Sequence, residues 1–207
     1  MAFSINQFYS ELSLGGARPS MFEVRITNPV NGGADQKVPF MCKAASIPAA
    51  EMTPVVQNYF GRPLKFAGNR TYADWTVTII NDEDFAVRKT LEIWNEALNG
   101  YEDNLRDAQL GSPNSYKADA EVIHYGKRGD IIRTYKLVGL FPTVIDAISL
   151  SWDDADTIEE YGVTFAYDYW VTDGVSGNLG DIVSSLGRQA ISSAASELRK
   201  KATSFLT

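Results

Sequence analysis

The 207-residue sequence predicts a mainly β, antiparallel fold with one flanking α-helix. About seven or eight segments alternate apolar and polar residues with the two-residue period of a strand. Turn-forming residues, including "NPVNGGADQ" and "GKRG", separate these segments at short intervals. Before the C-terminal region, only one segment has a clear helical period. Many short antiparallel strands favour a β-barrel or a β-sandwich.

The strands follow one another along the chain, and in most of them the apolar residues occupy every second position. In the first segment Phe22, Val24 and Ile26 alternate with polar residues, and in the second Val38, Phe40 and Cys42 do the same. The segments "KADAEVIHY" and "DIIRTYKLVGL" flank "GKRG" and predict a hairpin. Seven strands are expected over 21–27, 37–44, 74–80, 117–125, 130–140, 143–152 and 161–170, and one or two short ones lie in the segment described next.

The segment 46–70 is a long excursion interrupted by proline and glycine, in which only one or two short strands are expected, around 55–60 and 64–67. Long loops in compact domains are uncommon and usually functional. A helix follows over 82–99, because Asn81 or Asp82 can cap it and Gly100 follows its end. Its apolar stripe, which we expect to cover an open end of the barrel, consists of Val87, Leu91, Trp94 and Leu98.

The chain divides into a β domain at 1–173 and a C-terminal extension at 174–207. The extension begins with the glycine-rich hinge "GVSGNLG" and continues as an amphipathic helix with a basic end, expected over 179–205. A disordered tail is the alternative. The extension carries +2, so the chain's net charge of −7 leaves −9 on residues 1–173.

Composition limits the class of protein. The apolar fraction of 44% and the charged fraction of 22% are typical of a soluble globular protein. Cys42 is the only cysteine, so no internal disulfide is possible. The N-terminus lacks a basic region and a long apolar run, so we expect neither a signal peptide nor a membrane anchor. The negative charge argues against tight binding of nucleic acid through the whole surface.

Catalytic and metal-binding patterns are not found. His124 and Cys42 each lie in a strand pattern, and no partner residues at catalytic spacing accompany them. Asp154 and Asp156 begin like a calcium loop, but Glu159 stands where that loop needs glycine. We therefore expect no catalytic residue, cofactor or metal. A hydrolase that uses the acidic cluster at 153–156 and a monomeric binding module remain as alternative classes.

Four stretches resemble the major tail tube protein of contractile-tailed bacteriophages in order and spacing, over about residues 17–171. They are "ARPSMFEV", "FMCKAASIPA", "FAGNRTYADWTVTIINDED" and "GLFPTVIDAISLSWDDADTIEEYGVTFAYDYW". The resemblance implies a small β-barrel or sandwich, similar to the tube protein of type VI secretion. It also implies that six subunits form a ring, and that rings stack into a hollow tube inside a contractile sheath and conduct DNA into the host.

The implied partners are other copies of the chain, the tail sheath protein, the baseplate tube initiator and the tail terminator. DNA passes without specific binding, and no stable association with a membrane is expected. The implied location is the virion tail, assembled in the host bacterial cytoplasm. A tube initiator, a terminator or a secretion-system tube protein is the alternative within the same fold.

The resemblance also suggests which residues make contacts. Arg70 and Asp74 match the family's "GNR…DW" stretch and either pair, within or across subunits, or fix a turn before the next strand. In the last strand Tyr161, Val163, Phe165, Tyr167 and Tyr169 form an aromatic and apolar row. The opposite polar row, expected to face the lumen, holds Glu160, Thr164 and Asp168. The acids of 153–160 either line the lumen, where they would repel phosphates, or form a solvated outward loop. Candidate contacts to the adjacent ring are Ile47, Pro48, Met52, Val55, Tyr59, Phe60 and Arg62.

Overall fold

The structure is a computed structural model that describes residues 5–12, 15–153 and 156–172. The hinge and helix expected within 174–207 lie outside the described residues. Nine strands occur in the described part: β1 (Phe22–Ile26), β2 (Cys42–Ala45), β3 (Glu51–Tyr59), β4 (Arg62–Thr71), β5 (Trp75–Ile80), β6 (Ala118–Tyr125), β7 (Ile131–Ile145), β8 (Glu160–Ala166) and β9 (Tyr169–Thr172). The helices there are α1 (Ile5–Glu11), α2 (Val38–Met41), α3 (Ala86–Leu98) and α4 (Pro113–Tyr116), with short 3-10 turns η1 (Gly32–Ala34) and η2 (Ala108–Leu110).

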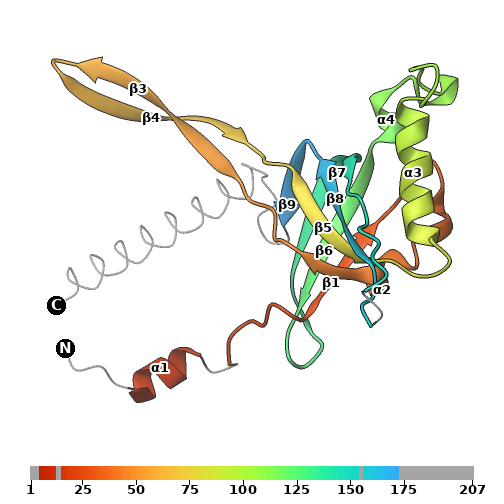
Figure 1. The fold of residues 1–207 in the computed structure, drawn as a ribbon. Helices are drawn as coiled ribbons and strands as arrows, with labels where there is room; N and C mark the ends of the chain where they lie inside the picture. Colours follow the sequence, from red (N-terminus) through yellow and green to blue (C-terminus); the bar gives the residue numbers. More distant parts are fainter. Residues whose placement is uncertain (1–4, 13–14, 154–155, 173–207) are drawn as a thin grey trace, which may run out of the picture. The chain divides into compact units, whose positions relative to one another are not determined.

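Seven strands form one antiparallel sheet in the order β1-β6-β7-β8-β5-β2, with β9 also paired to β7. The remaining two, β3 and β4, pair only with each other and form a separate hairpin (Figure 1). The terminal strands β1 and β2 are not hydrogen-bonded to each other, so the sheet stays open there. The predicted mainly β, antiparallel fold with a flanking helix is confirmed.

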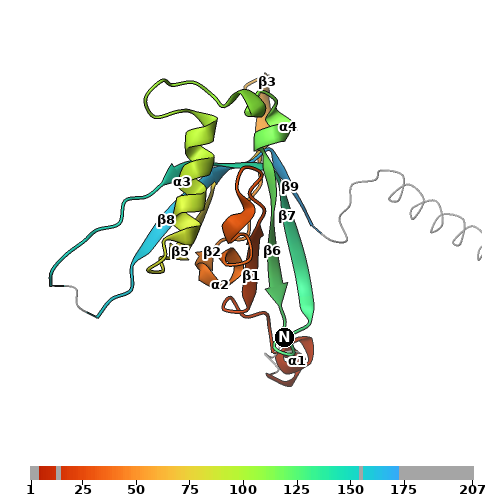
Figure 2. The same cartoon turned by 90° about the vertical axis from the view of Figure 1, so that its right-hand side faces the viewer.

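The core lies between one face of this sheet and α3, which packs against it in both views (Figures 1 and 2). Alternation along the strands directs every second side chain inward, as the sequence pattern predicts. The predicted stripe of α3 is confirmed, with Val87, Leu91 and Trp94 buried and Leu98 partly buried. On β5 and β8 the buried side chains are Trp75, Val77, Ile79, Tyr161, Val163 and Phe165.

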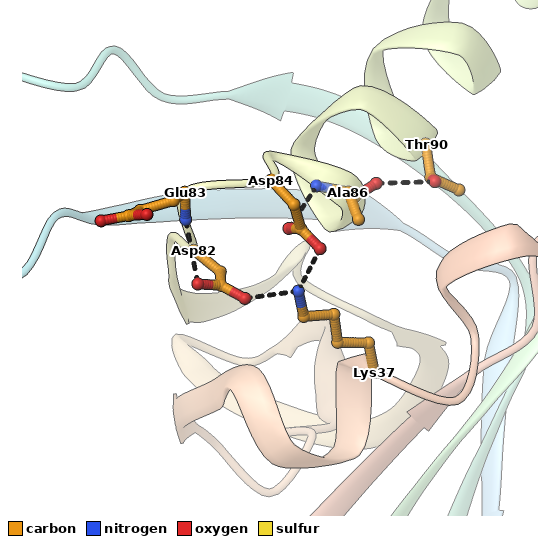
Figure 3. Close-up of polar contacts among 6 residues, drawn as sticks. All are labelled: Lys37, Asp82, Glu83, Asp84, Ala86 and Thr90. Atoms are coloured by element: carbon orange, nitrogen blue, oxygen red, sulfur yellow. Dashed lines mark hydrogen bonds and ion pairs between the residues drawn. The ribbon is translucent and has the colours of Figure 1, made fainter.

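The start of α3 differs from the prediction: the helix begins at Ala86, not near residue 82. The Lys37 ammonium lies 2.5 Å from a carboxylate oxygen of both Asp82 and Asp84 (Figure 3). The Asp84 carboxylate also accepts a hydrogen bond from Ala86 N, at 3.0 Å. These contacts hold 82–85 as a turn, so Asp84 rather than Asn81 or Asp82 satisfies the first free N–H of the helix. The hydrogen bonds from Lys37 also lower the pKa of both aspartates.

The predicted strand at 37–44 is wrong in its first half. Residues Val38–Met41 form the helix α2, and only Cys42–Ala45 continue as a strand. Pro39 lies in the first turn of α2, where its missing N–H leaves no bond unmade and its fixed φ suits a helix. As a result Phe40 does not share the buried face with Val38; it is 82% exposed.

The sheet turns a corner within β7. Residues up to Leu140 pair with β6, whereas Phe141–Ile145 pair with β8. Gly139 has a φ of 73°, and the Asp168 carboxylate occupies the space that a Cβ would need there. The strand predicted at 143–152 is wrong beyond Ile145, where β7 ends, and the next backbone contact to β8 is the Asp146 N–H, which donates to Gly162 O at 2.9 Å.

The last predicted strand is broken in two. β8 ends at Ala166, and the chain bends before β9, which pairs with a different part of β7. The Asp168 N–H donates to Val138 O at 3.0 Å in this bend. The buried row therefore stops at Phe165, while Tyr169 is exposed.

The excursion at 46–70 is more regular than expected. β3 and β4 form a long hairpin, which we call the arm (Glu51–Thr71). Its two-residue loop consists of Phe60 and Gly61, with φ of 47° and 80°, as a type I′ turn requires. Near the base the register shifts between Met52 and Pro54, and a Cβ on Gly68 would collide with the Thr53 carbonyl oxygen.

The core and the arm should respond differently to the same substitution. Leu91→Ala removes buried volume beneath α3 and should lower the free energy of unfolding by about 2–5 kcal/mol. The matched control Leu64→Ala lies on the exposed arm and should cost less than about 0.5 kcal/mol. Urea unfolding of the dilute protein measures both. Equal losses would contradict the assignment of Leu91 to the core.

Gly68→Ala should distort the arm without unfolding the body, because its new Cβ meets backbone rather than a movable side chain. We expect faster tryptic cleavage after Lys65 or Arg70, with an unchanged thermal transition of the sheet. Gly111→Ala is the control, since its Cβ would find only ordinary contact with Ala108 O at 3.8 Å. Unchanged cleavage in the Gly68 variant would show that the bulge tolerates a side chain.

Candidate functional site: assembly surfaces

The arm exposes apolar side chains on both of its faces. Every residue of β3 and β4 apart from Gly68 is exposed. No arm residue belongs to the core cluster or to the hydrophobic residues packed against it, so the described part of the chain leaves the apolar area of the arm exposed. Contiguous exposed apolar surface usually marks an interaction site. The exposed apolar residues of the arm are Met52, Val55, Val56, Tyr59, Phe60, Leu64 and Phe66.

The tip of the arm is aromatic and strained. Phe60 is 91% exposed and its ring stacks edge-on against Tyr59, with centroids 4.6 Å apart. A left-handed backbone costs a residue with a Cβ roughly 1–2 kcal/mol, so Asn or Gly is the usual choice at this turn position. Strained conformations that persist in native proteins cluster at functional sites. Phe60 therefore combines a strained backbone with an exposed aromatic ring. Burial of the ring against another surface would offset the free-energy cost of these two features.

Two tryptophans hold the root of the arm. Trp75 Nε1 donates to Ser46 O at 2.8 Å, and Trp170 Nε1 donates to Ala49 O at 3.1 Å. Ile47 and Pro48 lie between these two carbonyls, with Ile47 exposed and Pro48 buried in its own subunit. Of the seven residues that the sequence suggests for the contact, Pro48 thus supports the root, and the other six expose their side chains.

Arg70 and Asp74 do not pair with each other in this chain. Arg70 lies opposite Met52 in the arm, and Asp74 directly precedes β5. Both are exposed, and no ion pair among the described residues involves either of them. Of the two pairings that the sequence leaves open, the one within a subunit is absent here.

The polar row of β8 is smaller and more neutral than the sequence suggests. Glu160 and Thr164 share a face of β8, but Asp168 lies in the bend that follows it. Glu160 forms an ion pair with Lys43, and Thr164 Oγ1 lies 3.1 Å from Thr76 Oγ1. Asp168 accepts from Lys117 Nζ at 2.7 Å. All three partners were missed, because they are far away in sequence and only the strand register brings them close.

Residues with other possible chemistry have structural contacts. His124 Nε2 lies 2.8 Å from Arg18 O. Burial raises the pKa of the Cys42 thiol to about 12, as for a cysteine packed near a core. The described residues contain no group of three or more histidine, cysteine or carboxylate side chains that could hold a metal ion. No helix of the described part is long and apolar enough to span a membrane.

Comparison with known sequences gives a consistent result. A family model described as phage tail tube protein matches residues 17–173. The chain is 32% identical over 155 residues to the tail tube protein gp19 of Enterobacteria phage T4, covering 74% of this chain and 90% of that protein. It is 23% identical over 175 residues to the tail tube protein of Serratia phage KSP90, covering 82% of this chain and 97% of that protein. The matched proteins are structural and not enzymes.

Solved structures support the fold. A chain of the anti-feeding prophage baseplate, in a 6-fold symmetrised structure, aligns with a TM-score of 0.53 and 10% identity over 78% of this chain and 97% of that one. A chain of the anti-feeding prophage tube-terminating cap aligns with a TM-score of 0.52 and 13% identity, over 76% of this chain and 90% of that one. The family match spans all strands of the described sheet and the whole arm, and on that ground the chain belongs to the phage tail tube protein family.

Proposed function

We propose that this protein is the repeating subunit of a phage tail tube, in which six copies form a ring and the rings stack into a hollow tube. The observation that carries the proposal is the arm, whose apolar side chains are not buried by the described residues of its own subunit. A contact between two different surfaces of identical chains propagates as a ring or a filament. Sixfold symmetry is supported by the 6-fold symmetrised baseplate, a chain of which shares this fold.

In this proposal the arm reaches the adjacent ring. Its contacts are Met52, Val55, Tyr59, Phe60 and Arg62, with Ile47 exposed at the root. Arg70 and Asp74, which carry no ion pair within the described chain, are available to pair across subunits. The aromatic residues supply most of the buried area, as at other protein interfaces.

The polar face of β8 lines the lumen and lets DNA pass. Glu160 is neutralised by Lys43, and Thr164 faces Thr76 as an uncharged hydroxyl pair. This surface offers phosphates neither a cluster of free cations to bind nor a wall of free acids. The face therefore avoids the salt-dependent attraction that several lysine or arginine contacts would create.

The tube lies inside a contractile sheath in the virion tail, which is assembled in the host cytoplasm. The sheath protein, a baseplate initiator and a terminator are its partners. The fold is shared with a sheath/tube terminator chain of an extracellular contractile injection system, at a TM-score of 0.52. A terminator or initiator role is the second candidate, because the structural neighbours include a cap and a baseplate. The 32% identity to a tail tube protein favours the repeating subunit.

Electron microscopy of the purified protein over a concentration series tests the assembly. We expect rings with a central hole and six subunits, joined into tubes at high concentration, because each subunit exposes an arm. Capped single rings that never elongate would favour the terminator role. Monomers at every concentration, even with a baseplate initiator added, would contradict the proposed function.

Thr164→Arg should convert the lumen from a neutral into a cationic surface while tubes still form. Because six subunits contribute, six to ten phosphate contacts become possible, and binding of duplex DNA should fall about 10³–10⁵-fold between 50 and 200 mM salt. Co-sedimentation with short duplexes added during polymerisation measures this. Thr164→Gln is the uncharged control. Intact Thr164→Arg tubes that retain no DNA at low salt would place Thr164 outside the lumen.

A further inference from the structure

We propose that the tip of the arm docks on a second copy of this chain, in the acidic groove at the C-terminal end of α3. The proposal rests on the proposed function, since it names the surface that receives the arm during stacking. One side of the contact is basic and aromatic, and the other is acidic and partly apolar. The two sides are on different parts of the same sequence, so each subunit offers both.

The arm is the basic part of an acidic chain. Between residues 51 and 71 it carries three cations and one acid, Glu51, and hence +2. The rest of 1–173 then carries −11, because those residues together carry −9. Arg62 and Lys65 flank the aromatic tip, and neither forms an ion pair among the described residues. Their charge is therefore directed toward a partner.

The groove has the complementary character. Its volume is about 720 Å³, and it lies between the last turns of α3 and the loop that follows them. Tyr101 and Leu105 supply exposed apolar surface, at 68% and 66%. Around them stand Glu96, Glu102, Asp103 and Asp107, none of which forms an ion pair within the described residues.

Arg106, the one cation among the described residues that line the groove, is already engaged. The Arg106 guanidinium lies over the Tyr116 ring at 4.8 Å, and its Nε donates to Leu98 O at 3.4 Å. Asp103 and Asp107 each accept a backbone N–H of their own loop. Within the described part of the chain, the side chains of Glu96 and Glu102 accept no such hydrogen bond, so these two carboxylates are the best placed to receive Arg62 and Lys65.

Other hollows of the described surface fit the tip less well. The pocket at Phe22, Ile47 and Val122 is apolar but contains no carboxylate. The pocket at Arg25 and Lys136 contains both signs of charge, and Lys136 is paired there with Asp119 at 2.9 Å. Charge complementarity favours the groove beside α3, because four acids and one already engaged cation line it, whereas the pocket at Arg25 and Lys136 holds three cations and two acids.

A charge exchange tests the contact directly. The arm variant combines Arg62→Glu with Lys65→Glu, and the groove variant combines Glu96→Lys with Glu102→Lys. Each should raise the concentration needed for tube formation at least about tenfold, because like charges then meet. A protein that carries all four substitutions should recover to within about threefold of the original, since the attraction is restored with reversed signs. Light scattering and electron microscopy measure tube formation, and circular dichroism checks that each variant is folded.

The control joins the arm variant to Glu83→Lys and Asp153→Lys, two exposed acids that do not line the groove. This combination must not recover. If the protein with all four substitutions does not recover, the groove is overturned as the receiving surface. The same holds if tube formation recovers only when the arm variant carries the control substitutions. In both cases the proposed function remains intact. An arm variant that polymerises normally would also overturn it. If the original protein forms neither rings nor tubes with an initiator present, the proposed function itself fails.

Discussion

The burial of Trp75 is the interaction on which the rest of the structure depends. Its ring lies in the core, 5.9 Å from the Phe165 ring, while its indole N–H reaches out to Ser46 O at 2.8 Å. One side chain thus joins the packing of β5 on β8 to the root of the arm. Trp170 adds a second hydrogen bond at Ala49. Because these contacts derive from the core, the root of the arm is held even though the arm itself buries nothing.

The charged side chains of the described surface fall into two groups: those that form ion pairs within the subunit and those that do not. On the open face of the sheet, Lys43, Lys117 and Lys136 each meet a carboxylate within the subunit. On the arm and in the loop after α3, charges of opposite sign lack such partners in the described chain. Surface ion pairs contribute little to folding, but unpaired complementary charges select partners and orientation. In the proposed function, this division would separate a surface that water or passing DNA contacts from surfaces that build the assembly.

The arm also explains why an isolated subunit is an unfavourable state. Its strained, exposed Phe60 and its apolar faces raise the free energy of the monomer without contributing to its core. In the proposed tube, association would remove this apolar area from water, and that gain would drive assembly. This arrangement suits a subunit that polymerises. The body folds by burying its own core residues, and the exposed apolar residues of the arm remain available for contacts between subunits.

Sequence alone determined the sheet strands with one buried face and the helix stripe, because burial on one side imposes a period that residues such as Val77 and Leu91 reveal. The four stretches within residues 17–171 that resemble the tail tube family also predicted the tube role. Only the tertiary structure decided the conformation of segments in which the hydrophobic period is short or absent. Pro39 began a helix inside an apparent strand, and the arm, exposed on both faces, has no period to reveal its length. The partners of Glu160, Thr164 and Asp168 lie 51 to 117 residues away, and only the pairing of strands brings such distant side chains together.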